Sequence, residues 1–479
     1  MNDKMIRYIL GWILTVEAGL LLLSCLVAVI YRERAGFSLL GTALLCAVIG
    51  GCLTIKKPED NGIYSKEGFV IVALSWIVMS CLGAIPFVLG GAIPSYVDAL
   101  FETVSGFSTT GASILSDVES LPKSLLFWRS FTHWIGGMGV LVFVMAVIPL
   151  SGGTSIFLMR AESPGPSVEK LVPGAKKTAF ILYAMYIAIT LVEMVVLLIG
   201  RMPVFDSIVL TLGTAGTGGF GIRNDSLGSY TDFQQIVVTV FMILFGVNFN
   251  AYYLLYRRKW KEALRSVEVR TYFLIILTAV ILIAVNARGF FDSAFEAVKH
   301  SAFQVASVIT TTGYSTVDFD LWPAFSKTIL VVLMFVGACA GSTGGGMKVS
   351  RFILLFKSMG KELDYVIHPR NIRKVAMDGK SVEHAVMRSV NVYLVAYGLV
   401  FVVSLLLISL ENLDMTTNFT AVSATLNNIG PGLSLVGPTG NFAMFSPFSK
   451  LVLIFDMLAG RLELFPMLIL LSRNTWRRR

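Results

Sequence analysis

The chain has 479 residues, of which 55% are hydrophobic and only 14% charged, well below the roughly 25% of charged residues found in soluble domains. A soluble protein of this length would divide into several domains to bury so much apolar surface, so lipid is the simpler solvent for it. The net charge of +9 does not by itself indicate nucleic acid binding, because the basic residues are placed like topology signals.

Ten stretches are long and apolar enough to cross a bilayer, whose hydrocarbon core needs about 20 helical residues. In chain order they are 8–30, 36–55, 69–93, 130–150, 178–200, 233–256, 271–287, 328–356, 389–410 and 448–472. The sequence therefore predicts an all-α, multi-pass membrane protein.

The basic residues are distributed unevenly between alternate loops. If the N-terminus is cytoplasmic, most of the 39 Lys and Arg residues lie on the cytoplasmic side, above all in the loops 257–270 and 357–388. This asymmetry follows the positive-inside rule and predicts that both termini are cytoplasmic. No nucleic acid partner is expected. The five cysteines lie in apolar segments without metal-type spacing and are interpreted as small hydrophobic side chains.

After the first two spans the chain repeats one unit four times: a span, a short apolar segment, a glycine-rich turn and a second span. The short segments are 98–108, 205–215, 299–309 and 415–425. A helix of about 11 residues is about 16 Å long and crosses only half of the hydrocarbon core. These segments are therefore predicted to be re-entrant half-helices.

The four copies align on a glycine that ends each turn: Gly111, Gly219, Gly313 and Gly430. Six positions earlier the residue is always small: Ser105, Gly213, Ser307 or Ala424. Two positions earlier it is Thr109, Thr217, Thr311 or Asn428.

Non-helical backbone at membrane depth is tolerated where it is buried in protein or lines a wet cavity. Glycine permits backbone conformations that turn successive carbonyls to one side, and a ring of carbonyls can replace the hydration shell of a monovalent cation. Each half-helix would also point the negative end of its dipole at the ion. The alternative is that these are ordinary loops between spans, but four copies at equivalent places favour a pore.

At these residues the chain resembles the membrane subunit of the Trk/Ktr/HKT superfamily of potassium transporters, in its TrkH branch. The resemblance covers essentially the whole chain. It rests on the segments 108–112, 214–221, 310–315 and 427–432, and on 129–139, which is similar to the start of the second helix of the family's first repeat.

The resemblance implies four helix–pore-loop–helix repeats in pseudo-fourfold symmetry, preceded by two additional transmembrane helices. The corresponding regions are 1–67 for the two helices and 68–177, 178–270, 271–388 and 389–479 for the repeats. It also implies that the filter that binds potassium consists of Thr109, Thr110, Gly111 and Ala112; Thr217, Gly218, Gly219 and Phe220; Thr311, Thr312, Gly313 and Tyr314; and Asn428, Ile429, Gly430 and Pro431.

The implied cargo is K⁺, with Rb⁺ as a second ion and Na⁺ as a weak one. In plant relatives a serine at the first filter glycine accompanies sodium preference, whereas this chain has Gly111. The second and fourth strands depart from the plain Thr-x-Gly pattern with Gly218 and Ile429 before the glycine, as other family members do.

The resemblance further implies a bacterial inner-membrane homodimer with a TrkA-like regulatory subunit on its cytoplasmic face. That subunit binds the nucleotide, since this chain shows no nucleotide site. The basic loops 257–270 and 357–388 fit either a cytoplasmic protein or anionic membrane lipid.

Arg461 lies within the last predicted span, where a charge costs roughly 2.5–3.5 kcal/mol and therefore faces a cavity or a partner. One interpretation is an internal salt bridge with Glu463, Asp456 or another helix. The other, which the family resemblance supports, is a positive barrier to cations beneath the filter. The two are compatible.

The stretch 337–348 interrupts the eighth span with several glycines, among them Gly341, Gly344, Gly345 and Gly346. Its spacing fails the phosphate-loop pattern, because Met347 separates Gly346 from Lys348 and no strand precedes it. Glycines inside a long span predict a kink or break. The family implies an intramembrane loop that gates the pore here, and close helix packing is the alternative.

Several other polar residues lie in or near the spans. Acids near the predicted outer vestibule either concentrate cations or cap half-helices: Asp98, Glu102, Asp206 and Asp292. Glu17 and Glu193 are predicted to meet other helices, and His133 and Trp134 to be interfacial anchors.

Two other classes of function are weaker. An intramembrane enzyme is disfavoured because the four histidines are scattered and no nucleophile–base pair is apparent. A secondary symporter of another solute or cation is the stronger rival. Such folds often have inverted repeats, however, whereas here a half-helix precedes the glycine in all four copies, which indicates parallel repeats around one axis.

Overall fold

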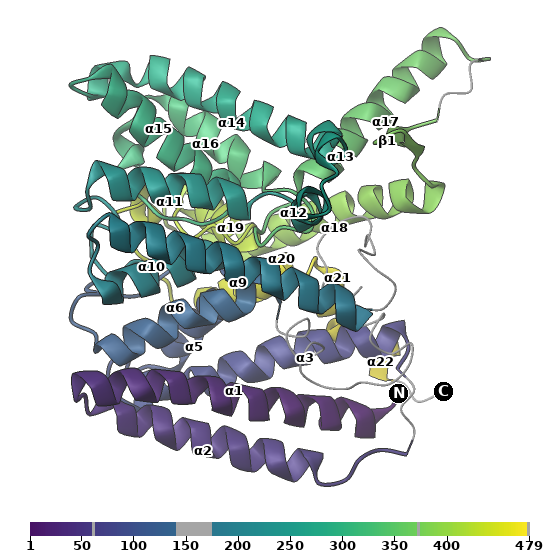
Figure 1. Ribbon diagram of the computed structural model, residues 1–479. Helices are drawn as coiled ribbons and strands as arrows, with labels where there is room; N and C mark the ends of the chain where they lie inside the picture. Colours follow the sequence, from purple (N-terminus) through teal and green to yellow (C-terminus); the bar gives the residue numbers. More distant parts are fainter. Residues whose placement is uncertain (60–62, 140–174, 371–373, 477–479) are drawn as a thin grey trace.

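The structure is a computed structural model that describes residues 1–59, 63–139, 175–370 and 374–476. The predicted span at 130–150 is thus described only as far as residue 139, and its remainder lies outside the described residues. The long helices lie side by side along one common direction (Figure 1). The first turn of α1, the short helix α13 and the final helix α22 are all at the same end of the bundle (Figure 1).

Two helices precede the repeats and form one edge of the molecule: α1 (Asp3–Tyr31) and α2 (Ala35–Thr54). The first repeat contains α3 (Ser65–Gly83), α4 (Ile85–Leu89), α5 (Tyr96–Phe107) and α6 (Lys123–Gly137). The second contains α9 (Ala175–Ile199), α10 (Val204–Gly216), α11 (Asp232–Phe245), α12 (Phe249–Tyr256) and α13 (Trp260–Arg265).

The third repeat contains α14 (Val267–Asn286), η1 (Arg288–Phe290), α15 (Ala294–Ile309), η2 (Phe319–Leu321), α16 (Ala324–Val336) and α17 (Val349–Ile367), followed by the antiparallel strands β1 (Ala376–Met377) and β2 (Lys380–Ser381). The fourth contains α18 (His384–Ile408), η3 (Ser409–Glu411), α19 (Met415–Leu426), η4 (Ser434–Val436), α20 (Pro447–Arg461), α21 (Phe465–Leu471) and α22 (Arg473–Trp476). The predicted all-α fold with four helix–loop–helix repeats is confirmed.

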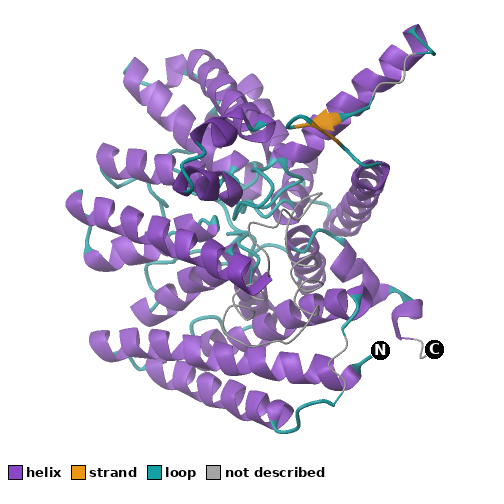
Figure 2. Cartoon of the chain, turned by 45° about the vertical axis from the view of Figure 1, so that its right-hand side comes forward, coloured by secondary structure: helices purple, strands orange, loops and turns teal. Residues whose placement is uncertain are grey.

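The four half-helices are α5, α10, α15 and α19, and they match the predicted segments to within a few residues except that α15 begins five residues earlier. A polar side chain caps three of them: Ser95, Ser293 and Asp414 each accept a hydrogen bond from the backbone N–H three positions later. Loops and turns gather near the centre of the molecule, between the helices (Figure 2).

Six helices among the described residues are long and apolar enough to cross a membrane: 3–31, 35–54, 65–89, 177–199, 267–286 and 384–411. They correspond to six of the ten predicted spans. The chain is therefore an integral membrane protein, as predicted.

The prediction of one continuous span at 233–256 is wrong, because α11 and α12 meet at an angle of 90°. Helix α11 ends at Phe245 with Gly246 as its C-cap, and the side chain of Asn248 accepts a hydrogen bond from Asn250 N (2.8 Å) and so begins a new helix. We call this bend, residues 246–248, the elbow.

The last predicted span, 448–472, is also broken. Glu463 and Leu464 have positive φ values of 60° and 66° between α20 and α21. Pro466 then stands in the first turn of α21, where its missing N–H leaves no intrahelical bond unmade. Arg461 is consequently the last residue of a helix and does not lie in the middle of one.

Helices α1 and α2 pack closely because small residues face one another. A Cβ on Gly50 would overlap Gly11 O and Thr15 Oγ1, whereas a Cβ on its neighbour Gly51 would meet nothing within 4 Å. Small residues at such crossings let two backbones approach within van der Waals distance in lipid.

Gly50→Ala is expected to push α2 away from α1 and to lower the melting temperature of the purified protein, since overpacking of this kind costs about 1–3 kcal/mol. Gly51→Ala makes the same change in helix propensity one residue later and should leave the melting temperature unchanged or slightly raised. Equal melting temperatures for the two variants would contradict the close packing at Gly50.

Candidate functional site

Four short segments follow the half-helices and share one backbone geometry. We call them the glycine strands; they are residues 109–112, 217–220, 311–314 and 428–431. The residue two positions before each glycine has a positive φ: 55° at Thr109, 54° at Thr217, 58° at Thr311 and 56° at Asn428. The glycines are also left-handed, at 78° for Gly111, 76° for Gly219, 87° for Gly313 and 98° for Gly430. This repeated alternation is costly for residues with a Cβ and common for glycine.

The glycine strands form a closed ring in which each glycine packs on the next repeat. A Cβ on Gly111 would overlap Gly218 O, and one on Gly219 would overlap Thr312 O. The pattern continues around the ring, with Gly313 against Ile429 O and Gly430 against Thr110 O. The strand of the first repeat thus contacts that of the second, the second contacts the third, the third the fourth and the fourth the first. Because these contacts close on themselves, the four strands surround one axis.

The ring opens on one side into a cavity of about 130 Å³. All four glycines line it: Gly111, Gly219, Gly313 and Gly430. Gly111, Gly219 and Gly313 keep partial exposure while the residues on either side of them are buried; in the fourth strand Gly430 is buried and Pro431 keeps partial exposure. The structure thus brings all sixteen predicted filter residues together in one ring beside this opening.

Two aromatic residues of the glycine strands point away from the ring and are fully buried. The Tyr314 hydroxyl donates to Leu210 O of α10 (3.2 Å). The ring of Phe220 lies beneath the guanidinium carbon of Arg129 at 3.5 Å and beside His133 at 4.2 Å between ring centroids. These side chains thus attach the second and third glycine strands to the surrounding helices, on the side away from the axis of the ring.

A buried polar network on α5 and α6 supports the first two strands. Glu102 forms an ion pair with Arg129 (2.5 Å) and accepts hydrogen bonds from Ser113 Oγ and Ile114 N (both 3.0 Å). Arg129 also donates to Gly221 O (2.9 Å). Glu102 is therefore neither a vestibule acid nor a helix cap, since its carboxylate is buried and fixes the chain just beyond Gly111.

His133 and Trp134 are not interfacial anchors, and that prediction is wrong. His133 is fully buried, hydrogen-bonds to Gly106 O through Nδ1 (2.7 Å), and its ring occupies the space where a Cβ of Gly218 would be. Trp134 is partly buried and stacks on Tyr186 of α9 (5.4 Å between centroids). Arg129 and His133 are four residues apart on one helix and therefore lie on the same helical face. This spacing is the sequence signal from which a shared neighbour could have been predicted.

Two of the other three predicted vestibule acids also bind side chains from neighbouring segments, whereas the third, Asp292, is exposed. Asp98 pairs with Lys450 of α20 (2.5 Å), and Asp206 accepts from the Tyr230 hydroxyl (2.9 Å). Glu17 and Glu193 are fully buried inside the bundle. The prediction that they meet other helices is therefore confirmed.

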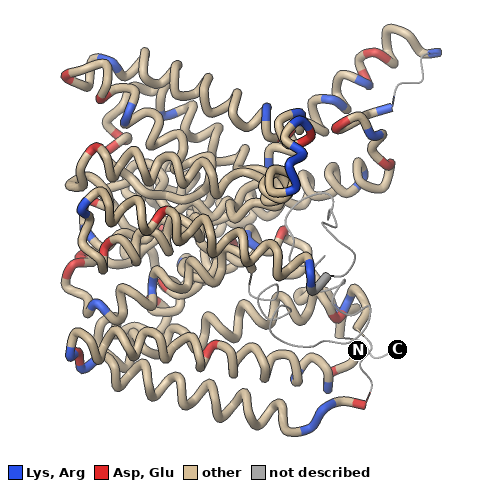
Figure 3. Tube along the Cα trace, viewed as in Figure 1, with Lys and Arg blue, Asp and Glu red and all other residues tan. Residues whose placement is uncertain are grey.

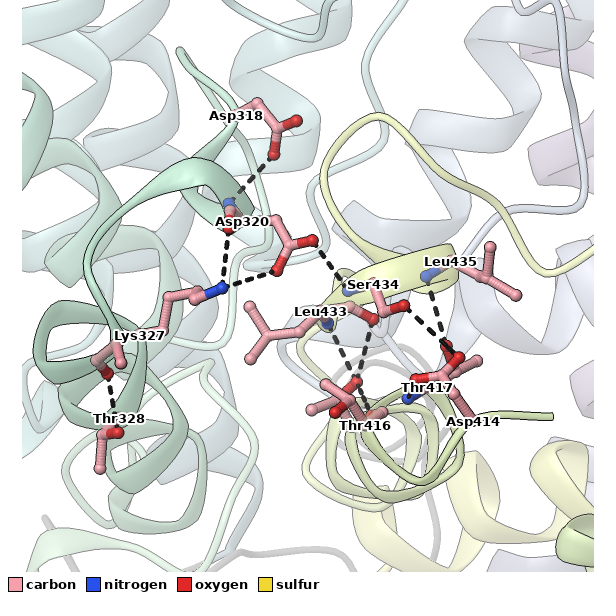
Figure 4. Close-up of polar contacts among 12 residues, drawn as sticks. Asp318, Asp320, Lys327, Thr328, Asp414, Thr416, Thr417, Leu433, Ser434 and Leu435 are labelled. Carbon is pink, nitrogen blue, oxygen red and sulfur yellow. Dashed lines mark hydrogen bonds and ion pairs between the residues drawn. The ribbon is translucent and has the colours of Figure 1, made fainter. Parts of the chain in front are cut away.

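Hydrogen bonds join the outer segments of neighbouring repeats all around the ring. Figure 4 shows the contact between the third and fourth repeats, where Asp320 accepts from Ser434 N (3.2 Å) and pairs with Lys327 (3.6 Å). Between the first and second repeats, Val118 N donates to Asn224 Oδ1 (2.8 Å). Between the second and third, Leu227 N donates to Ser315 O (2.9 Å), and between the fourth and first, Phe442 N donates to Ser113 O (2.8 Å).

The segment 337–348 is a loop that separates α16 from α17, so the predicted break is confirmed. Gly345 N donates to Thr311 Oγ1 (2.6 Å), which places this loop directly against the third glycine strand. Lys348 is buried and donates to the carbonyls of Gly344 and Gly345. We call residues 337–348 the intramembrane loop.

The elbow and α14 hold the same loop from the side. Cys339 N donates to Gly246 O (3.1 Å), and Phe249 N donates to Gly341 O (3.0 Å). Glu268 at the start of α14 accepts from Ala340 N (2.7 Å).

Arg461 contacts backbone carbonyls from two other repeats. It donates to Thr343 O of the intramembrane loop (2.8 Å) and to Gly136 O (2.5 Å) and Gly137 O (2.8 Å) of α6. The two acids considered as its ion-pair partners bind elsewhere: Glu463 pairs with Arg351, and Asp456 accepts from Ser404 Oγ (2.6 Å).

A second cavity, of about 90 Å³, lies next to this arginine. Its lining includes Arg461, Lys348, Gly341, Gly344, Gly345 and Gly346. All five predicted gate residues therefore face one space, and Gly345 links its lining to the third glycine strand.

Comparison with known proteins decides the family. The family model TrkH, described as a cation transport protein, matches residues 36–477. The chain belongs to the TrkH family of cation transport proteins.

Individual relatives agree with this assignment along their whole length. The chain is 36% identical to the Trk system potassium uptake proteins TrkH of Salmonella typhimurium and Escherichia coli, with 100% of each chain covered. It is 33% identical to the E. coli protein TrkG over 99% of both chains. The crystal structure of the potassium transporter TrkH from Vibrio parahaemolyticus superposes with a TM-score of 0.89 at 31% identity, again covering 100% of each chain. The predicted membership of the TrkH family is confirmed.

The ion pair between Glu102 and Arg129 gives a prediction that does not depend on transport. Glu102→Gln or Arg129→Gln alone leaves one buried charge unpaired and should destabilise the protein by about 3–5 kcal/mol. The double variant carries no buried charge at this place and should recover part of the loss, measured as melting temperature in detergent. Strictly additive effects of the two single changes would contradict the coupling.

Proposed function

We propose that this chain forms the membrane pathway of a bacterial potassium uptake system. The observation that carries the proposal is the closed ring of four glycine strands, supported by family membership and by relatives named as potassium uptake proteins. One strand comes from each of the repeats 68–177, 178–270, 271–388 and 389–479. Potassium is the transported substrate, and the family is one of cation transporters rather than enzymes.

The proposed selectivity filter is the set of glycine strands, and its ligands are backbone carbonyls. Left-handed residues alternate with residues of ordinary conformation along each strand, so successive carbonyls turn toward the same side. Carbonyls at a ring replace the water shell of K⁺, and the half-helices α5, α10, α15 and α19 add their negative dipole ends. Acidic side chains are not needed at such a site; those near the outer cavity serve as braces in the protein.

The proposed gate lies on the opposite side of the filter from the outer cavity. Gly345 of the intramembrane loop is bonded to Thr311 of the third strand, and Thr343 of the same loop accepts from Arg461. A positive charge beside the second cavity raises the electrostatic energy of a cation there. Loop and arginine together are therefore proposed to control flux, while the ring chooses the ion.

The proposed orientation places both termini in the cytoplasm of the bacterial inner membrane, in agreement with the positive-inside rule. The first turn of α1 and helix α22 are at one end of the bundle (Figure 1), as this requires. On the same face we propose that a cytoplasmic nucleotide-binding regulatory subunit docks, so that nucleotide acts only through this partner. A homodimer is proposed for the membrane subunit.

The central test is growth of a potassium-uptake-deficient bacterium at low potassium. The wild-type chain should restore growth, and confirmed membrane insertion without rescue would overturn the proposal. Gly313→Ala should abolish rescue, because its Cβ would overlap Ile429 O at a residue with φ of 87°. Gly289→Ala is the matched control, since a Cβ there meets nothing within 4 Å, and it should rescue like wild type.

Arg461→Ala should raise cation flux in reconstituted vesicles at least about fivefold, because even 1 kcal/mol of relieved repulsion changes a rate by about that factor. Arg461→Gln should act in the same direction, since it removes the charge but keeps a hydrogen-bond donor for Thr343 O. Arg461→Lys keeps the charge and should retain low flux. A lysine variant as leaky as the alanine variant would show that charge is not the barrier.

A further inference from the structure

The connection between α12 and α14 carries the densest run of exposed basic side chains among the described residues. We call residues 256–265 the basic strap. Five of its side chains are basic and exposed: Arg257, Arg258, Lys259, Lys261 and Arg265. Its one acid, Glu262, is already paired with Lys259 (3.0 Å). Figure 3 shows this charge as a continuous blue stretch at the end of the bundle where α14 begins.

Large apolar side chains are interleaved with these charges and are exposed as well. Tyr256 is 82% exposed, Trp260 60% and Leu264 67%. Trp260 and Leu264 are four residues apart in α13 and therefore share one helical face, whereas Ala263 between them is buried and attaches the helix to the protein. Exposed tryptophan and leucine are unfavourable in bulk water and favourable at the boundary between headgroups and acyl chains.

The position of the strap along the bundle matches that boundary. Helix α14, which begins two residues after α13 ends, is long and apolar enough to cross the membrane. The strap is thus juxtamembrane, at the end of the bundle that also carries the first turn of α1 (Figure 1).

We propose that the basic strap binds the headgroups of anionic phospholipids, with Arg257, Arg258 and Lys261 contacting phosphate and with Trp260 and Leu264 inserted among the acyl chains. Each Lys or Arg near an anionic surface contributes to such binding, and amphipathic segments add the burial of apolar area. The leaflet follows from the orientation proposed above; the binding itself does not depend on the transport function.

The apolar side chains favour lipid over a soluble acidic protein. A protein partner that bound only the charges would leave Tyr256, Trp260 and Leu264 in water. Insertion into the bilayer surface covers these side chains and neutralises the basic ones at the same time.

The site also has a short physical connection to the intramembrane loop. The strap joins α12, the helix after the elbow, to α14, and both helices hold the loop: Phe249 N of α12 donates to Gly341 O, and Glu268 of α14 accepts from Ala340 N. Bound lipid would fix the relative positions of these two supports. Potassium flux is therefore expected to change with the anionic lipid content of the membrane.

The test is lipid binding to the purified full-length chain in detergent, with phosphatidylglycerol or phosphatidylcholine added and bound lipid counted by native mass spectrometry. The triple variant Arg257→Gln/Arg258→Gln/Lys261→Gln should bind phosphatidylglycerol at least about tenfold more weakly than wild type. The control variant Arg370→Gln/Lys374→Gln/Lys380→Gln removes equal charge from exposed positions in the other basic loop and should bind like wild type.

A third variant separates lipid from other anions. Trp260→Ala/Leu264→Ala keeps every charge and should still weaken phosphatidylglycerol binding, and inorganic phosphate should not displace the lipid. The proposal would be overturned if the strap triple variant and the control triple variant lost phosphatidylglycerol binding equally, or if the strap triple variant bound this lipid as fully as wild type. It would also be overturned by displacement of the lipid by inorganic phosphate, or by binding of a soluble acidic protein that depends on the strap while lipid binding does not.

The folding of each variant is checked by its melting temperature in phosphatidylcholine. If the triple variant fails to fold, the double variant Arg257→Gln/Lys261→Gln is used for the same binding measurement. Flux in vesicles of either lipid is a second readout. Wild type should respond to phosphatidylglycerol and the triple variant should not. If lipid binding fails while transport persists, only this inference falls.

Discussion

The close approach of four glycine Cα atoms to four carbonyl oxygens is the constraint on which the rest of the structure depends. Because Gly111 packs on the second strand, Gly219 on the third, Gly313 on the fourth and Gly430 on the first, no strand can shift along the axis without opening a gap or an overlap on both sides. The four half-helices must therefore end at one depth. Their similar lengths, the polar caps of three of them and the hydrogen bonds between neighbouring outer segments all serve this requirement.

The side chains behind the ring differ from repeat to repeat although the backbone does not. The first two strands are supported by a buried ion pair, Glu102 with Arg129, and by the imidazole of His133. The third strand is held by the hydroxyl of Tyr314, and the amide of Asn428 in the fourth donates to Met457 O (2.8 Å). A single chain, unlike four identical subunits, can tune each strand separately. The sequence departure at Gly218 follows from this: Gly218 is small because the ring of His133 takes its side-chain space.

The sequence was sufficient for the repeats and the glycine strands because both depend on local rules, namely apolar length and the need for glycine at positive φ. It was insufficient where a residue's role depends on which helix lies opposite. Glu102 near a pore entrance and His133 near a helix end suggested solvent, but α5 and α6 pack face to face and bury both. Hydropathy also predicted continuous spans at 233–256 and 448–472, because an apolar run does not reveal that Asn248 caps a new helix or that residue 464 turns back.

The two unpredicted breaks and the predicted break at 337–348 lie together. The elbow after α11, the intramembrane loop after α16 and the turn after α20 interrupt the second helix of three successive repeats, and they are bonded to one another: Cys339 to Gly246, and Arg461 to Thr343. On the side of the first cavity the repeats keep their equivalence and form a ring. On the other side the same helices bend in different ways, and one loop and one arginine occupy the space by the second cavity. A fourfold arrangement suits the choice of an ion, since every ligand is equivalent. Control of flux instead requires an element that is present only once. A single loop that moves as a unit can be biased by one partner or one lipid without distorting the ring.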